Sequence, residues 1–193
     1  MAKEVWIIIV NPVAGKRSTR ELAQRMKHNL SEYEIDVWLS LTKAHCDAER
    51  LTRRAVEAGS TNVIVCGGDG TVYEAVNGLM SAPDASLNTT LGIIPSGQCN
   101  DLAAILGFRM DPRNVADALM NADTQTIDLG CVRDRCYVTV ATLGFDSEVN
   151  QYVDQGSPLW HPVIMGGWIS ALLMRFQSYK PCSPFLRCSL VPA

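Results

Sequence analysis

Residues 63–79 read VIVCGGDGTVYEAVNGL, and this stretch decides the fold. An apolar run ends at the glycine-rich turn 67–71, and a helix-like pattern follows it. Glycine adopts backbone conformations that other residues avoid, and it lets a ligand touch the main chain. Such a turn before a helix directs several N–H groups, and the positive end of the helix dipole, toward an anion such as phosphate. The alternative is a turn that only closes a strand-to-helix crossover.

The same order of strand and helix repeats along the first part of the chain. Short apolar runs predict strands, and helical spacing with capping signals predicts helices. The predicted strands are 5–10, 35–41, 62–66 and 91–94, and the predicted helices are 18–30, 47–58, 72–80, 100–106 and 112–121. This strict alternation predicts an α/β fold with a parallel sheet covered on both faces.

The unusual turns all follow predicted strands. They are 11–15, Thr42, 67–71 and 95–100. In open parallel sheets, ligands bind beyond the carboxyl ends of the strands, so these turns predict one shared site. Asp69 stands out there because a carboxylate repels phosphate. It fits the site if a divalent metal bridges the two groups, or if it holds a ribose or a metal-bound water.

The character of the chain changes after Thr124. Segments 125–132 and 135–143 predict a hairpin with its turn at Asp134, and 185–191 predicts a further strand. We therefore expect an α/β domain over 1–123 and an incomplete, mainly β domain over 124–193. The apolar stretch 162–176 is expected to be a helix packed on a core, with a membrane-surface helix as the minority alternative.

Composition narrows the function classes. The chain has 193 residues and a formal net charge of −3, so no overall positive field favours nucleic acid. Seven cysteines without a C-x-x-C pair indicate neither a disulfide framework nor a zinc site, and they favour a reducing, cytoplasmic compartment. The N-terminus does not resemble a signal peptide. The three histidines, at 28, 45 and 161, are predicted to form no metal set.

Four blocks in this order resemble the diacylglycerol kinase catalytic-domain family, which includes bacterial lipid kinases and sphingosine kinases. The blocks are NPVAGK at 11–16, Thr42, GGDGTVYEAVNGL at 67–79 and GIIPSGQCNDLA at 92–103. The resemblance continues through 127–130, 142–146 and 167–181. The phosphate-loop pattern G-x-x-x-x-G-K-[ST] and the dinucleotide pattern G-x-G-x-x-G are both absent.

The resemblance implies ATP-dependent phosphorylation of a lipid hydroxyl. It implies an N-terminal domain of the phosphofructokinase and NAD kinase type, followed by the start of a β-sandwich domain. It implies that Asp69 organises Mg²⁺, directly or through water. It also implies a lipid substrate at a membrane surface and a cytoplasmic protein with peripheral membrane contact; a homodimer is left open. The implied nucleotide-binding residues are Asn11, Pro12, Val13, Ala14, Gly15, Lys16, Thr42, Gly67, Gly68, Asp69, Gly70, Thr71, Glu74, Ser96, Gly97, Gln98, Asn100 and Asp101.

Two departures from the family pattern bear on activity. Gln98 and Cys99 stand where the family has Thr and a small neighbour. The family's general base and second metal site are expected in a C-terminal part beyond this sequence, and Asp146 matches a different family position. We therefore expect weak activity from these 193 residues alone. Two alternatives stay open: a non-catalytic nucleotide-binding or regulatory module, and an NAD kinase-like enzyme.

The acceptor is open among diacylglycerol, another glycerolipid, a sphingoid base and an isoprenoid alcohol. Basic residues on the second predicted helix could touch lipid headgroups, although a solvated helix face explains them equally well. They are Arg50, Arg53 and Arg54.

Overall fold

The computed structural model describes residues 5–15, 19–31, 33, 35–107, 115–121, 123–142, 144–145 and 147–149. Contacts divide the chain into two compact units, Met1–Thr139 and Val140–Ala193. All helices and strands named below lie in the first unit. The domain boundary predicted at 123 lies inside that unit, and the predicted mainly β second domain remains a prediction.

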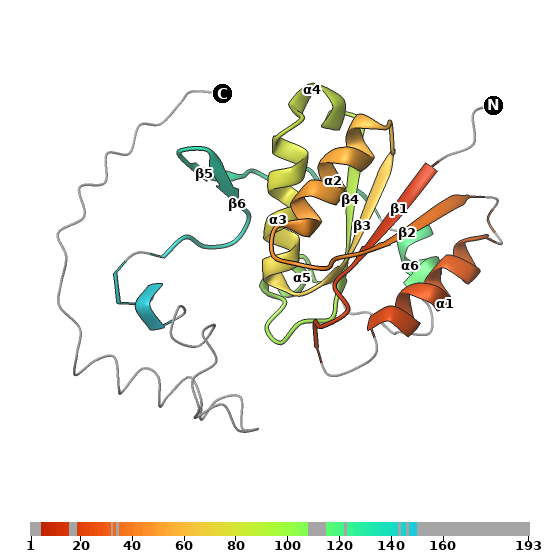
Figure 1. Cartoon of the computed structure of the whole chain (residues 1–193), viewed down its shortest axis with the longest axis horizontal. Helices are drawn as coiled ribbons and strands as arrows, with labels where there is room; N and C mark the ends of the chain where they lie inside the picture. Colours follow the sequence, from red (N-terminus) through yellow and green to blue (C-terminus); the bar gives the residue numbers. More distant parts are fainter. Residues whose placement is uncertain are drawn as a thin grey trace. The chain divides into compact units, whose positions relative to one another are not determined.

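The first unit is built on a four-stranded parallel sheet (Figure 1). Its strands are β1 (Val5–Val10), β2 (Asp36–Leu41), β3 (Asn62–Gly67) and β4 (Thr90–Pro95), in the spatial order β2-β1-β3-β4. All four predicted strands are therefore confirmed to within one or two residues, and so is the α/β class.

Helices cover both faces of the sheet. They are α1 (Thr19–Ser31), α2 (Asp47–Glu57), α3 (Asp69–Met80), α4 (Pro83–Ser86), α5 (Asp101–Ile105) and α6 (Val115–Met120). In Figure 1, α1 and α6 lie on one side of the sheet, and α2 and α3 lie on the other. In α1, Ala23, Met26 and Leu30 recur at helical spacing and are all buried, so one apolar stripe faces the sheet.

Two apolar clusters hold these layers together. Because side chains alternate along a strand, Ile8 and Val10 of β1 join the cluster under α1, whereas Ile9 joins the cluster under α2 and α3. All three are fully buried. Burial of one such side chain contributes about 1.5–3 kcal/mol, so the sheet is fixed from both sides.

One helix begins earlier than predicted, and one short helix was not predicted. Helix α3 begins at Asp69 rather than Val72, because Gly68 has an extended backbone (φ −96°, ψ −172°) and the chain turns helical directly after it. The short helix α4 was not predicted. Pro83 lies at its start, where the fixed φ of proline suits the first helical turn.

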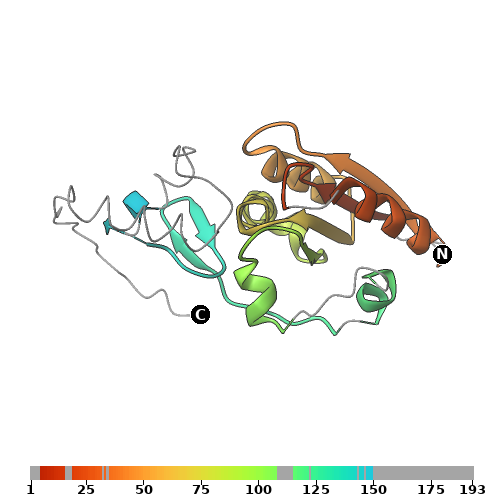
Figure 2. The same ribbon diagram turned by 90° about the horizontal axis from the view of Figure 1, so that it is seen from below.

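The predicted hairpin is present but much shorter than expected. It consists of β5 (Gly130–Val132) and β6 (Arg135–Tyr137), joined by a turn at Arg133 and Asp134. The stretch 125–129 was predicted as strand, and this is wrong. It is unpaired and extended (Figure 2) and lines a cavity of about 850 Å³ beside β4. The residues of the glycine-rich turns do not line this cavity.

Contacts remote in sequence hold the hairpin on α3 and α2. The buried Asn77 side chain donates to the carbonyl oxygen of Cys136 and accepts from its N–H, each at 2.9 Å. Arg135 forms a two-pronged ion pair with Glu49 at 3.0 and 2.8 Å. Cys131 and Cys136 form a disulfide across the two strands, which cysteine spacing did not predict.

Several predicted features lie outside the described residues. They are Lys16, Ser18 of the capping signal, Asp146, the helix at 162–176 and the strand at 185–191.

Candidate functional site

The glycine-rich turns meet at the point where the sheet reverses its winding. From β1 the chain proceeds to β2 on one side, whereas β3 lies on the other side of β1 and continues to β4. In parallel sheets, this switch opens a crevice at the carboxyl ends of the two central strands. Asn11 follows β1, and Gly67 ends β3. The predicted convergence of these turns is therefore confirmed.

The start of α3 is an open helix N-terminus. Gly68 is its N-cap, and no side chain caps the helix there. Gly70 is exposed, and a Cβ placed on it would meet nothing within 4 Å. The first N–H groups of a helix have no partner within the helix, and they attract anions together with the dipole. This N-terminus can accept a phosphate group.

Asn11 joins the first turn to the glycine-rich turn. Its side-chain amide donates to the Thr71 hydroxyl at 3.1 Å, and its backbone N–H donates to the Cys66 carbonyl at 2.9 Å. Its side-chain oxygen accepts from the N–H of Val13 at 3.1 Å. The contact of Asn11 with a nucleotide stays a prediction, and the structure shows that Asn11 links the first turn to the glycine-rich turn.

The turn after β4 packs directly on the other two turns. The backbones of Gly68 and Gly97 touch, since a Cβ on Gly97 would lie 2.5 Å from Gly68 Cα. Gly15 has φ +74°, and a Cβ there would lie 1.8 Å from the Ser96 carbonyl oxygen. Glycine is thus required at these contacts by close approach, and the three turns form one rigid surface.

The Asp69 carboxylate points to the start of α5. Its two oxygens accept from the N–H groups of Asn100 (2.8 Å) and Asp101 (2.7 Å). Asn100 in turn closes its own loop by bonding both the N–H and the carbonyl of Gly97, at 2.8 and 3.0 Å. This role for Asp69 was not anticipated from the sequence. It explains how an acidic residue is tolerated at the predicted anion site, because two N–H donors hold its charge.

Glu74 is also engaged by a neighbouring helix. Its carboxylate accepts from the N–H groups of Cys46 (2.9 Å) and Ala48 (3.0 Å), which open α2. The side chain of the N-cap residue, Cys46, does not cap α2, and the Glu74 carboxylate from α3 caps it instead. The predicted contact of Glu74 with a nucleotide stays a prediction, and its carboxylate already has two partners.

The other predicted residues that the structure describes follow the carboxyl ends of the strands. Thr42 donates its backbone N–H to the Val10 carbonyl at 2.9 Å, which places it at the same edge as Asn11. Pro12, Val13, Gln98 and Asp101 are exposed. Burial raises the pKa of Cys66, directly beneath the turn, to about 12, so its thiol stays neutral at physiological pH.

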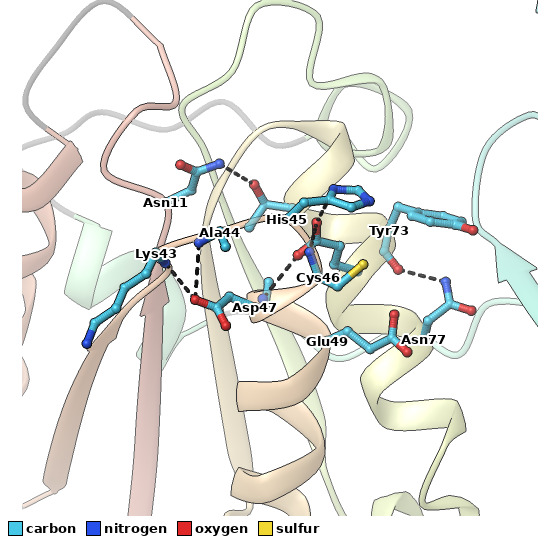
Figure 3. A network of polar contacts seen from close by, with 12 residues as sticks. Asn11, Lys43, Ala44, His45, Cys46, Asp47, Glu49, Tyr73 and Asn77 are labelled. Carbon is cyan, nitrogen blue, oxygen red and sulfur yellow. Dashed lines mark hydrogen bonds and ion pairs between the residues drawn. The ribbon is translucent and has the colours of Figure 1, made fainter. Parts of the chain in front are cut away.

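A polar network lines the start of α2 (Figure 3). Asp47 accepts from the N–H groups of Lys43 (2.7 Å) and Ala44 (3.2 Å), and it pairs with Arg50. The hydrogen bond from Arg50 lowers the pKa of Asp47 below its usual value. Arg50 is therefore paired with Asp47, and Arg53 lies 3.8 Å from Glu57. Because acidic partners offset both positive charges, these two arginines attract a lipid headgroup less strongly than unpaired arginines would.

The sequence-family model described as the diacylglycerol kinase catalytic domain matches residues 5–132 of this chain. This chain belongs to the diacylglycerol kinase catalytic-domain family. The match includes the three glycine-rich turns, so the family and the geometry identify the same part of the chain.

Individual relatives agree with this assignment. A Chromohalobacter salexigens protein named probable lipid kinase YegS-like is 29% identical over 189 residues, covering 95% of this chain and 57% of the relative. A diacylglycerol kinase of Mycobacterium tuberculosis is 35% identical over 148 residues, covering 74% and 46%. A crystal structure of a diacylglycerol kinase from Bacillus anthracis superposes with a TM-score of 0.61 at 28% identity, covering 70% of this chain and 48% of that chain.

The chain spans about half the length of the curated relatives it matches. Among the helices that the structure describes, none is both long and apolar enough to cross a bilayer.

Proposed function

We propose that this chain is the nucleotide-binding part of an ATP-dependent lipid kinase, in which the ATP phosphates lie on the N-terminus of α3. The observation that carries the proposal is an uncapped helix N-terminus at the switch point of the sheet. Gly70 leaves space above it, and Asp69 is turned aside to α5. Phosphoryl transfer depends mainly on positioning and charge neutralisation, and a rigid backbone surface serves the first of these.

The residues beside this N-terminus fit Mg²⁺ held through water. Burial raises the pKa of the Cys99 thiol, and the negative charges of Asp101 and Asp69 raise it further, so both carboxylates act on this part of the site. Each Asp69 oxygen accepts one N–H and keeps further acceptor capacity for a metal-bound water. When bound, Mg²⁺ would supply charge neutralisation for the phosphates.

The chain's own residues position the reactants in this proposal. Asn11 holds the first turn on the glycine-rich turn, and the contact of Gly68 with Gly97 fixes the third turn. Because these parts are braced before a nucleotide binds, little reorganisation is needed. Gln98 lies exposed at the rim, where it can donate to a phosphate or a base. We assign no general base among the described residues.

The acceptor in this proposal is a lipid hydroxyl. Relatives named diacylglycerol kinase and lipid kinase support the class of acceptor, while the particular lipid stays open. The proposal includes a cytoplasmic protein that meets its substrate at a membrane surface. Assembly as a homodimer remains a separate proposal, to be tested by the mass in solution.

Substitution of Gly70 tests the phosphate site without disturbing the fold. The position is exposed and has free space above it, and a carboxylate in the first turn of a helix is favourable to the helix itself. Gly70→Glu should place a negative charge where the phosphates lie, and Gly70→Gln is the control of matched shape. Mg·ATP binding is measured by calorimetry for the wild type and both variants.

We expect wild-type binding that depends on Mg²⁺, weaker binding by Gly70→Gln and none by a folded Gly70→Glu. Equal binding by the two variants would show that the phosphates lie elsewhere. Phosphate transfer from labelled ATP to diacylglycerol vesicles then separates a kinase from a binding module, which would hold ATP without turnover.

A further inference from the structure

We propose that His45, Cys46 and Glu74 form a binding site for Zn²⁺ or a similar transition metal, separate from the proposed Mg²⁺ and phosphate site. His45 and Cys46 belong to the loop between β2 and α2, and Glu74 lies in the second turn of α3. One ligand atom from each lies within 4.8 Å of the others. Figure 3 shows His45 and Cys46 beside one another above the start of α2.

The spacing of these atoms suits a tetrahedral ion. Ligand bonds of about 2.0–2.3 Å to zinc place neighbouring donors about 3.4 Å apart. His45 Nδ1 and Glu74 Oε1 are already 3.2 Å apart. Cys46 is exposed, so its thiol can rotate to complete the set without moving the core.

The Glu74 carboxylate is held in place before any metal binds. Its side chain is 12% exposed, and the N–H groups of Cys46 and Ala48 fix its two oxygens. Metal-binding carboxylates are commonly oriented by such hydrogen bonds. The His45 side chain is 88% exposed, so the site is reached directly from solvent. Three protein ligands leave a fourth position for water.

The donor types select the metal. A nitrogen, a thiolate sulfur and a carboxylate oxygen suit zinc and its neighbours, whereas Mg²⁺ and Ca²⁺ prefer oxygen. A thiolate and a carboxylate together neutralise a divalent ion. This balance offsets the repulsion between a cation and the N-terminus of α2. Bound metal would join the loop that follows Thr42 to α3, at the sheet edge of the proposed phosphate site.

Sequence spacing did not indicate this cluster because Glu74 lies 28 residues from Cys46. The histidines, considered only as a set, predict no metal site from the sequence. In the structure, His45 lies beside Cys46 and Glu74 instead.

Titration with Co²⁺ alone tests the site. The protein is used with the Cys131–Cys136 disulfide intact and with Cys46 as a free thiol. A tetrahedral site with a thiolate gives visible d–d bands and a near-ultraviolet thiolate-to-cobalt band, and Zn²⁺ should abolish both by displacement. We expect one equivalent to bind the wild type. Cys46→Ser should remove the thiolate band, and His45→Ala should weaken binding at least tenfold. Both positions are exposed, so the variants should fold.

The matched control is Cys99→Ser, because Cys99 is the other exposed free cysteine that the structure describes. This variant should keep the full cobalt spectrum. The proposal is overturned if Cys46→Ser keeps the thiolate band, if Cys99→Ser loses it, or if the folded wild type gives only the octahedral spectrum of hydrated Co²⁺. None of these readouts depends on ATP or on kinase activity.

Discussion

The replacement Asp69→Asn tests whether this carboxylate organises the site through α5. In the wild type, its two oxygens accept N–H groups at 2.7 and 2.8 Å. Asparagine keeps one acceptor oxygen and turns an NH₂ group toward the second N–H donor. One hydrogen bond is therefore lost, the other is no longer assisted by charge, and two donors face each other.

The expected loss follows from the value of such bonds. A hydrogen bond to a charged group contributes about 1.5–3 kcal/mol. Asp101 is exposed and Asn100 is partly buried, so water can replace part of the loss. We expect the free energy of unfolding to fall by about 2 kcal/mol. Asp69→Ala removes both bonds and should cost about 3 kcal/mol.

Equilibrium unfolding in urea, followed by far-ultraviolet circular dichroism, measures this change. Asp84→Asn is the control, because Asp84 is exposed on α4 and its replacement should change the free energy by less than about 0.5 kcal/mol. Equal stability of wild type and Asp69→Asn would refute the reasoning. If only the Mg²⁺ dependence of ATP binding then changed, Asp69 would be a direct metal ligand instead.

Three further outcomes are expected. Asn77→Leu leaves the N–H and carbonyl of Cys136 without their side-chain partners, so the free energy of unfolding should fall by about 2–3 kcal/mol. Hydrogen exchange at the Cys136 amide should become faster, and an unchanged exchange rate would contradict this. Reduction of the Cys131–Cys136 disulfide, whose partners are five residues apart, should cost about 2 kcal/mol, and a variant with serine at both positions should not respond to the reductant. The hydrogen bond from Arg50 lowers the pKa of Asp47 in the folded state. Their pairing therefore stabilises the fold fully at pH values above the unfolded-state pKa of about 3.9, and this contribution is lost as the pH falls through the lower, folded-state pKa. Asp47→Asn should flatten that part of the stability profile, and an unchanged slope would count against the pairing.

The sequence by itself determined the four strands of the sheet, most of the helices, and the edge of the sheet at which the unusual turns meet. The apolar runs 5–10 and 62–66 favour strands through local sequence alone, because their β-branched residues suit a sheet buried on both faces. The glycines around Asp69 are equally local signals, since their backbone freedom needs no knowledge of distant residues. Alternation of strands and helices then placed the turns at one edge.

Only the tertiary structure decided which groups meet there. Asp69 bonds N–H groups 31 and 32 residues away, and Asn11 bonds Thr71 over 60 residues. No periodicity encodes such pairs, because they depend on the order of the strands and the path of the connecting loops. The short hairpin shows the same limit: its strands pair only where Asn77 and Arg135 hold it on α3 and α2, and extended propensity alone does not supply a partner strand.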